Sequence, residues 1–437
     1  MKTDHDKLMT ERGYAALLVS GPSTNNPPMY YLSNGVSIGE RSLLVKPRGQ
    51  DPVLLVSGME RDEAAKSGLR VIDLAQYRLA DLLKEERGDS LRATARLYGR
   101  VFADLGVSGK VVVYGLVDQG AAYALLSAIE ELNPGLQIAG EYGVSVFQTA
   151  AATKDAAEVR RIRAVGKQTV AVVGETAEFL TSHRAQGDYL VKRDGSRLLL
   201  GEVKAFINRR LLEHGVVDAE AGTIFAQGRD GGVPHSRGDA RQPMRLGRSI
   251  VFDIFPAEPG GGYFFDFTRT WCLGYAPDHV LEAYEQVREV YQQTLKALKP
   301  GAPCRDYQTL VCDYFEARGH PTIRTNPATT DGYVHSLGHG VGLYIHEAPS
   351  LSDRAGNTTV LEPGHVLTVE PGLYYPDHPQ GGFGVRLEDT VWLNPATLKF
   401  EILARYPYDL ILPVKPAKSL KPKSPHPKPQ SRRRRRV

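Results

Sequence analysis

The sequence predicts an α/β N-terminal domain followed by a larger α+β domain. In the first third, short apolar runs alternate with helical patterns. In the second half, aromatic-rich apolar runs flank Pro/Gly turns, which is typical of antiparallel pairing. Near residue 150 a long amphipathic pattern begins and marks a boundary. With 437 residues, 42% hydrophobic and 24% charged, the chain can build two or three domains with sizeable cores.

The first domain, residues 1–150, has the pattern of a mostly parallel or mixed sheet. No glycine fingerprint follows a strand there, and histidines and acids do not cluster, so we expect no catalytic site in it. The expected strands are 15–20, 41–47, 52–58 and 110–115, and the expected helices are 91–104 and 118–133.

The second domain, residues 151–412, opens with the segment "TAAATKDAAEVRRIRAVGKQTVAVVGETAEFL", which predicts one long amphipathic helix with Thr and Asp as N-caps. No internal repeat is visible. Further helices are expected at 278–299, where Pro300 and Gly301 stop the pattern, and at 305–318. Strands are expected at 248–255, 262–273, 366–375 and 384–393.

Residues 413–437 form a basic tail. They carry five lysines and five arginines and no acid, whereas the other 412 residues carry 44 basic and 50 acidic side chains, a net charge of −6. Interleaved Pro and Lys cannot bury apolar surface, so we expect this tail to be disordered. It would contact nucleic acid, the ribosome or another anionic surface. The alternative is a solvated extension without a partner.

Several features predict a cytoplasmic protein. The charged start lacks the apolar region of a secretory signal, and no run of 18 apolar residues suggests a membrane span. Cys272, Cys304 and Cys312 are too few and too scattered for a disulfide framework, so we expect them to be reduced packing residues.

Residues 335–347, "HSLGHGVGLYIHE", are rich in histidine and glycine. A helix would place His335 and His339 on one face. However, Gly338, Gly340 and Gly342 would each cost such a helix roughly 1 kcal/mol relative to alanine. An irregular strand or loop is therefore favoured, in which glycines let the backbone pass close to a bound group.

Residues 249–274, "SIVFDIFPAEPGGGYFFDFTRTWCLG", carry a hairpin signal. A turn centred between Pro259 and Gly260 would place Asp253 directly opposite Asp266, roughly 5 Å apart on one face. Like charges in that position repel unless a cation lies between them. A metal ion is the favoured interpretation, and two solvent-facing acids are the alternative.

Two further acids lie in apolar strand patterns, Glu370 in "VLTVEPGLY" and Glu388 in "GVRLEDTVWL", where Arg386 shares a face with Glu388. Any one of these acids alone would be an ordinary paired acid. Together, four carboxylates balance two divalent cations, and one neutral imidazole could add a fifth ligand. An oxygen-dominated set suits Mn(II), Co(II) or Fe(II), and Zn(II) less exclusively.

The order Asp, Asp, His, Glu, Glu, carried by "FDFTRT", "HSLGHGVGLYIHE", "VEPGLY" and "GVRLEDT", resembles the pita-bread metallopeptidases. Within them it is most similar to the Xaa-Pro peptidases, aminopeptidase P and prolidase. The resemblance covers residues 1–412 and implies a creatinase-like N-terminal α/β domain and a pita-bread catalytic domain. The helix that begins "TKDAAEVRRIR" is similar to the family's domain-joining helix.

The resemblance also implies a role for each site residue. In it, Asp266 and Glu388 bridge two metal ions, and Glu370 passes a proton from water to the leaving nitrogen. His346 steadies the tetrahedral intermediate, and Arg386 supports the hydrogen bonding of the site. The implied metal ligands are Asp253, Asp266, His339, Glu370 and Glu388. His235 and His335 match substrate-pocket histidines, with structural or surface histidines as the alternative.

The implied function is a dinuclear exopeptidase that hydrolyses the Xaa-Pro bond at peptide N-termini or in dipeptides, with two ions, Mn(II) first among the candidates. Family members are commonly dimers or tetramers, so we expect a homodimer or homotetramer. Two alternatives stay open: a creatinase-like C–N hydrolase, and a binding module that uses the basic tail. The interval of 13 residues between the two aspartates is two longer than the family's common spacing. Residues 183–197 resemble an insertion at a place where the family usually has a short connection. Both departures leave the exact substrate open.

Overall fold

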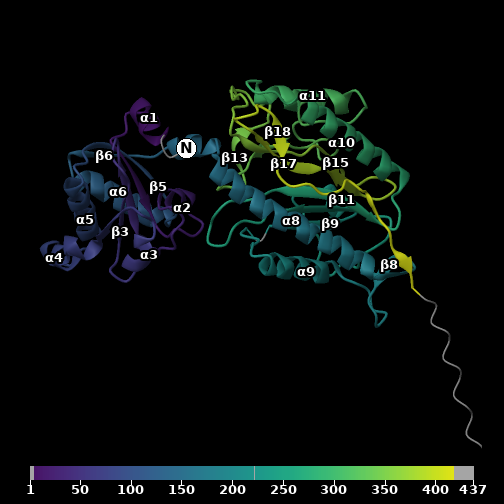
Figure 1. Cartoon of the computed structure of the whole chain (residues 1–437), viewed down its shortest axis with the longest axis horizontal. Coiled ribbons are helices and arrows are strands. Elements are labelled where there is room, and N and C mark those ends of the chain that lie inside the picture. The colour runs from purple at the N-terminus through teal and green to yellow at the C-terminus, as the bar shows by residue number, and fades with distance from the viewer. Residues whose placement is uncertain (1–3, 221, 418–437) are drawn as a thin grey trace, which may run out of the picture.

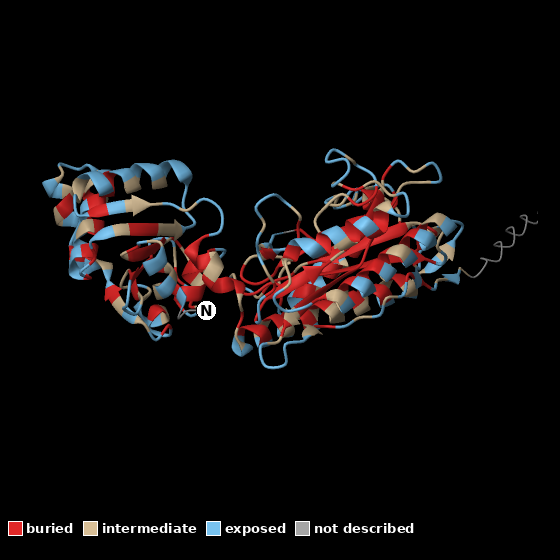
Figure 2. Ribbon diagram, turned by 90° about the horizontal axis from the view of Figure 1, so that it is seen from above, coloured by how far each residue is buried: buried red, intermediate tan, exposed pale blue. Residues whose placement is uncertain are grey.

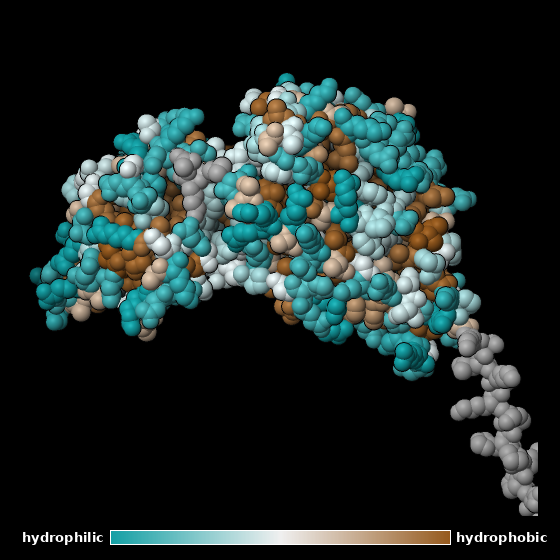
Figure 3. Space-filling model, viewed as in Figure 1, coloured by the Kyte–Doolittle hydropathy of each residue, from teal (hydrophilic) through white to brown (hydrophobic). Residues whose placement is uncertain are grey.

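The computed structural model describes residues 4–220 and 222–417, which fold into two lobes (Figure 1). In the described part, no helix combines the length and apolar character needed to cross a membrane. Hydrophilic side chains predominate on the face shown in Figure 3, with apolar residues scattered between them on both lobes. The basic tail that we predict to be disordered lies outside the described residues from 418 onward.

The N-terminal lobe is built on one mixed sheet with the strand order β4-β3-β2-β1-β5-β6, as the sequence predicts. β1 pairs antiparallel with β2 and parallel with β5. The strands are β1 (Ala16–Ser20), β2 (Leu43–Pro47), β3 (Val53–Val56), β4 (Arg70–Asp73), β5 (Gly109–Gly115) and β6 (Leu136–Ala139). The helices are α1 (Asp4–Glu11), α2 (Pro27–Leu32), α3 (Arg61–Ala65), α4 (Leu79–Glu85), α5 (Ser90–Asp104) and α6 (Gln119–Leu132), with a 3₁₀ turn at Leu74–Tyr77.

The C-terminal lobe contains a sheet of nine strands within the described residues. Its main path is β13-β12-β14-β17-β11-β10-β9, with β18 paired to β17 and β19 to β11. These strands are β9 (Ile224–Gln227), β10 (Ser249–Ile254), β11 (Phe267–Leu273), β12 (His339–Gly340), β13 (Glu347–Ser350), β14 (Val366–Val369), β17 (Glu388–Leu393), β18 (Phe400–Ile402) and β19 (Ile411–Leu412). A separate hairpin joins β15 (Gly372–Tyr375) to β16 (Phe383–Arg386).

Helices cover both faces of this large sheet, and the strands between them are mostly buried (Figure 2). One face packs on α8 (Ala156–Ser182) and α9 (Leu200–Glu213), and the other packs on α10 (Asp278–Ala297) and α11 (Cys304–Glu316). Along β10, Ile250 and Phe252 belong to the α8 side of the core. Because side chains alternate across a strand, Asp253 points to the opposite face.

Helix α8 begins where the sequence places a cap. The Asp155 side chain accepts hydrogen bonds from the backbone N–H groups of Ala157 and Glu158. The Glu158 side chain in turn accepts a hydrogen bond from the backbone N–H of Asp155. Further along, a Cβ at Gly166 would lie 2.5 Å from the ring of Phe265. Glycine at this position lets the ring pack directly on the helix and so fixes the residue before Asp266.

The predicted long helix is confirmed from its Asp155 cap onward, but the first residues of the predicted segment do not belong to it. The chain forms α7 (Val146–Ala152), passes through an extended stretch at Thr153, and begins α8 only after Asp155. The interruption arises because Asp155 caps a new helix, while the backbone of Lys154 bonds to Gly364. Helix α7 packs against both α1 and β13, so it lies at the joint between the lobes.

Several other details differ from the expectations. The strand predicted at 262–273 begins only at Phe267, and the strands predicted at 366–375 and 384–393 each break in two, after Val369 and at Leu387. Helix α9 was not expected. The segment 183–197 forms a hairpin of β7 (Arg184–Gln186) and β8 (Tyr189–Val191). The tail does not begin as a disordered segment at 413, because β20 (Lys415–Pro416) pairs in parallel with β7.

The three cysteines are free and buried, with Cys272 in β11 and the other two in α11. Burial raises the pKa of Cys272 and Cys304 to about 12. They are packing residues, as the sequence predicts.

Candidate metal centre

A cavity of about 430 Å³ opens on the large sheet and gathers the predicted site residues. Its volume lies in the range of small-molecule sites. The predicted residues that line it are Asp253, Asp266, His339, Glu370, Glu388, His346, His235, His335 and Arg386. They come from distant parts of the chain, so the fold alone brings them together.

The four carboxylates are placed by the ends of adjacent strands. Asp253 lies near the end of β10, Asp266 directly precedes β11, Glu370 follows β14, and Glu388 begins β17. Strand β17 lies between β14 and β11 in the sheet. Three neighbouring strands and the adjoining β10 therefore present their acids to one place.

The predicted register of the hairpin is wrong by two residues. Asp253 lies opposite Thr268, not Asp266. The turn is centred on Gly260 and Gly261, whose φ angles are +85° and +104°, values that favour glycine. A shift of two residues keeps the same face, so Asp253 and Asp266 become diagonal neighbours on the cavity side.

The segment 335–347 is an irregular strand, as its glycines predict. A Cβ at Gly338 would lie 2.2 Å from the carbonyl oxygen of Thr368, and one at Gly340 would lie 2.1 Å from that of Ala348. The backbone can therefore run close to both neighbouring strands, and His339 enters the cavity from β12.

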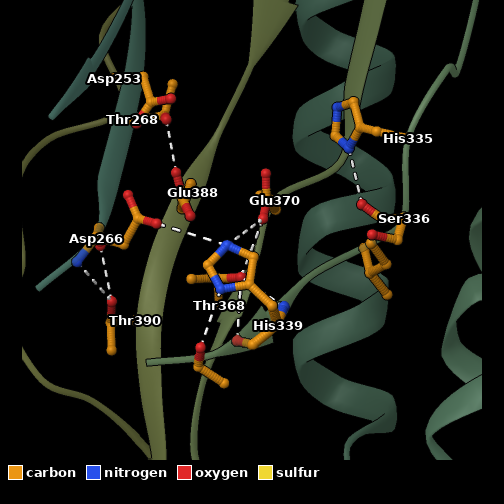
Figure 4. Close-up of polar contacts among 12 residues, drawn as sticks. Asp253, Asp266, Thr268, His335, Ser336, His339, Thr368, Glu370, Glu388 and Thr390 are labelled. Carbon is orange, nitrogen blue, oxygen red and sulfur yellow. Dashed lines mark hydrogen bonds and ion pairs between the residues drawn. The ribbon is translucent and has the colours of Figure 1, made fainter. Parts of the chain in front are cut away.

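His339 lies at the centre of the acids (Figure 4). Its Nε2 is 3.2 Å from Oε1 of Glu370 and 3.6 Å from Oδ2 of Asp266. Asp266, His339 and Glu388 each offer one ligand atom, and these three atoms lie within 4.8 Å of one another. This triad is compact enough to hold one metal ion.

Asp253 lines the cavity and also pairs with Arg386. One of its oxygens forms a buried ion pair with the Arg386 guanidinium, which also donates to the Tyr374 hydroxyl at 2.8 Å. The other oxygen, Oδ1, is buried and has no hydrogen-bond partner among the described residues, and the same holds for Oε1 of Glu388. Buried carboxylate oxygens without partners are costly. Two such oxygens in one cavity fit a site that offers ligands to divalent cations.

The electrostatics of the acids point the same way. Burial, reinforced by repulsion from neighbouring carboxylates, raises the pKa of Asp253, Asp266 and Glu388. Their charged forms are therefore disfavoured unless positive charge enters the cavity. Burial would also raise the pKa of Glu370, but the hydrogen bond and charge of His339 outweigh it and lower that pKa to about 2.

The remaining histidines surround this centre. The rings of His346 and His339 lie 4.3 Å apart at 63°. Burial and the charge of His339 lower the pKa of His346 to about 4, so its imidazole is neutral at pH 7. Nε2 of His335 lies 3.0 Å from the Tyr374 hydroxyl. His235 lines the cavity from the segment that follows β9.

Comparison with known proteins identifies the family of the chain. The sequence model of metallopeptidase family M24 matches residues 160–395, which contain all five potential ligands. The chain belongs to metallopeptidase family M24. Among curated proteins, this M24 member is 27% identical over 340 residues to the probable dipeptidase PepE of Mycobacterium tuberculosis, covering 78% of this chain and 76% of that protein. It is 33% identical over 193 residues to the Xaa-Pro dipeptidase of Pyrococcus furiosus, covering 44% of this chain and 50% of that protein.

Solved structures share the fold. The Xaa-Pro dipeptidase from Bacillus anthracis superposes with a TM-score of 0.72 at 23% identity, covering 94% of this chain and 99% of that one. The X-Pro aminopeptidase from Thermotoga maritima superposes with a TM-score of 0.68 at 22% identity, covering 92% of this chain and 99% of that one. This M24 member therefore has the pita-bread fold with an N-terminal domain, as the sequence predicts.

Three threonines support the acids of this M24 member and were not predicted. Thr368 donates to Oε1 of Glu370 at 3.1 Å, and Thr268 donates to Oε2 of Glu388 at 2.6 Å. Thr390 donates to the backbone carbonyl of Asp266 at 2.7 Å. Each threonine lies two residues from one of the acids, on the same strand face. The alternation rule that located the acids would have found these threonines too.

Proposed function

We propose that this chain is a dinuclear metal-dependent exopeptidase that hydrolyses the bond before proline, with Mn(II) as the ion first to test. The observation that carries the proposal is the convergence of Asp253, Asp266, His339, Glu370 and Glu388 on one cavity, with buried oxygens of Asp253 and Glu388 left unpartnered. These five residues would hold two divalent cations. When bound, such cations lower the pKa of water and polarise a carbonyl.

The chain's own residues would carry the proton transfers. Glu370 is unprotonated at neutral pH and can accept a proton from water, then pass it to the departing nitrogen. The proline nitrogen has no N–H in the peptide bond and must gain a proton to leave. His346 lies beside His339 and can donate its ring N–H where negative charge develops on the scissile carbonyl.

The other charges of the cavity favour a short substrate. Besides the five ligand candidates and Arg386, the charged side chains of the lining are Glu220 and Arg237. A zwitterionic dipeptide offers one ammonium and one carboxylate to these opposite charges. Arg237 forms no ion pair within 4.0 Å among the described residues. The backbone carbonyl of Arg237 accepts a hydrogen bond from the Lys204 ammonium at 3.0 Å. The Xaa-Pro dipeptidase of Pyrococcus furiosus is named for such a substrate. We therefore infer a preference for Xaa-Pro dipeptides.

The experiment compares hydrolysis of Ala-Pro and Ala-Pro-Ala by the whole chain with Mn(II), after chelation and after Mn(II) is restored. Cleavage of Ala-Pro that is lost on chelation and regained on restoration supports the proposal. Cleavage of Ala-Pro-Ala alone would make the chain an aminopeptidase. Activity that survives complete metal removal would favour the creatinase-like alternative. A homodimer or homotetramer, a cytoplasmic location and an anionic partner for the tail remain predictions.

A further inference from the structure

A buried ion pair ties the joint between the lobes to the turn that carries His346. Lys154 lies in the extended stretch between α7 and α8, and its ammonium pairs with Oε1 of Glu347. The two side chains are 1% and 3% exposed. Two further hydrogen bonds fix Lys154. Its ammonium donates to the carbonyl of Ala152 at 3.0 Å, and its backbone N–H donates to the carbonyl of Gly364 at 2.9 Å.

The Glu347 side chain also stabilises the turn formed by residues 342–347, to which it belongs. Its Oε2 accepts a hydrogen bond from the backbone N–H of Tyr344 at 3.3 Å. A Cβ at Gly342 would lie 2.5 Å from Oε1 of Glu347, so only glycine lets the carboxylate lie this close to the backbone. The carboxylate thus bonds to its own turn on one side and to Lys154 on the other. His346 is the residue directly before it.

His346 itself has few other restraints. Among the hydrogen bonds of residues 4–220 and 222–417, none involves its ring, and the side chain is exposed to the cavity. Apart from the contact of its ring with that of His339, its direction therefore depends on the backbone of the turn. The joint contacts this turn a second time, because the ring of Phe147 in α7 packs edge-on against Tyr344 at 6.3 Å.

A purely stabilising role explains this pair poorly. Burying two charges costs solvation energy, and apolar residues of similar volume often serve stability as well or better. A buried ion pair does, however, fix the orientation of the groups to which it is attached. We propose that Lys154 and Glu347 are positioning residues that set the orientation of His346 from the joint between the lobes. This inference rests on the role that the proposed function gives to His346.

The test measures kcat, KM and metal content for Ala-Pro cleavage by the whole chain and its variants. We expect Lys154→Met and Glu347→Gln to lower kcat about tenfold or more, because small displacements of catalytic groups are costly, with KM and metal content nearly unchanged. The matched control is Glu158→Gln, at the same joint, whose carboxylate accepts from Tyr263 at 2.6 Å instead of meeting the turn. This control should keep the wild-type kcat.

Two further measurements separate positioning from simple damage. In a His346→Ala background, Glu347→Gln should lower kcat less than twofold, since residues that act as a unit are not additive. The imidazole resonance assigned to His346 in spectra of histidine-labelled protein should shift in Lys154→Met and Glu347→Gln but not in Glu158→Gln. Should the single variants unfold, Lys154→Met combined with Glu347→Leu removes both charges at once and replaces the single variants in both measurements.

A multiplicative loss in the His346→Ala background, or an unmoved His346 resonance in the pair variants, would overturn the proposal. Failure of the wild-type chain to cleave any Xaa-Pro substrate is a different result. It would reject the proposed function, and the resonance of His346 would then decide the positioning role by itself.

Discussion

The Thr268 hydroxyl donates a 2.6 Å hydrogen bond to Oε2 of Glu388, and the two residues lie directly opposite each other in the pairing of β11 with β17. The contact fixes one oxygen of Glu388, while the other, Oε1, is the buried oxygen without a partner. The hydroxyl thus orients the carboxylate so that its free oxygen is available to a cation.

Thr268→Val should therefore weaken metal binding while leaving the fold intact. Loss of a hydrogen bond that orients a ligand typically costs roughly 10–100-fold in metal affinity. Titration calorimetry with Mn(II) measures the change directly. Thr309→Val in α11, whose hydroxyl donates to the carbonyl oxygen of Arg305, is the control. Equal affinities in the two variants would contradict the supporting role of Thr268.

Arg269→Met should destabilise the protein by about 3–5 kcal/mol, because breaking a fully buried ion pair leaves an uncompensated charge. Arg269 and Asp389 are 1% and 0% exposed and lie 3.0 Å apart. Arg269 also donates to the carbonyl of Glu388 at 2.8 Å. Urea unfolding gives the free energy of unfolding. Arg96→Met, which breaks an ion pair with Glu86 from an arginine that is 44% exposed, should change it by about 1 kcal/mol or less.

Stability should fall as the pH falls from about 6.5 to about 4, in part through His365. Burial, with the charge of Lys154, lowers the pKa of His365 to about 4 from 6.5. Between these values the unfolded chain binds more protons than the folded chain, so stability rises with pH. The histidine accounts for about 2 kcal/mol between pH 7 and pH 5. His365→Gln should remove that part of the pH dependence in urea unfolding, and an unchanged slope would refute the assignment.

Arg237→Gln should raise KM for Ala-Pro roughly tenfold, since a hydrogen bond to a charged group contributes about 1.5–3 kcal/mol. The amide Ala-Pro-NH₂ has no terminal carboxylate, so its KM should change less than twofold. Arg241→Gln, four residues along and outside the cavity lining, should leave both substrates unaffected. A parallel rise of KM for Ala-Pro and its amide would show that Arg237 does not recognise the carboxylate.

Much of the site could be predicted because side chains alternate on strands. That rule put Asp253 and Asp266 on one face even though the register was off by two, since a shift of two leaves the face unchanged. The register itself depends on which glycines take positive φ, and Gly260 and Gly261 lie one position beyond the Pro259–Gly260 centre that the sequence suggested.

Other features depend on contacts between distant segments, which local patterns do not reveal. The pairing of Arg386 with Asp253 and that of Lys154 with Glu347 each join residues more than 100 positions apart. The break between α7 and α8 has the same origin, because the backbone at Lys154 is drawn to Gly364 by a tertiary hydrogen bond. Helix α9 was missed because no element was assigned between the segment 183–197 and the strand expected at 248–255.

The order in which the ligand candidates occur along the chain has a consequence for biosynthesis. Asp253 in β10 is synthesised early and Glu388 in β17 late, and β17 joins β14 to β11 in the finished sheet. A chain interrupted before β17 lacks the last acid and the strand that separates β14 from β11. Hydrolytic activity would therefore be gained only when the whole sheet has formed, so an incomplete chain would be inactive.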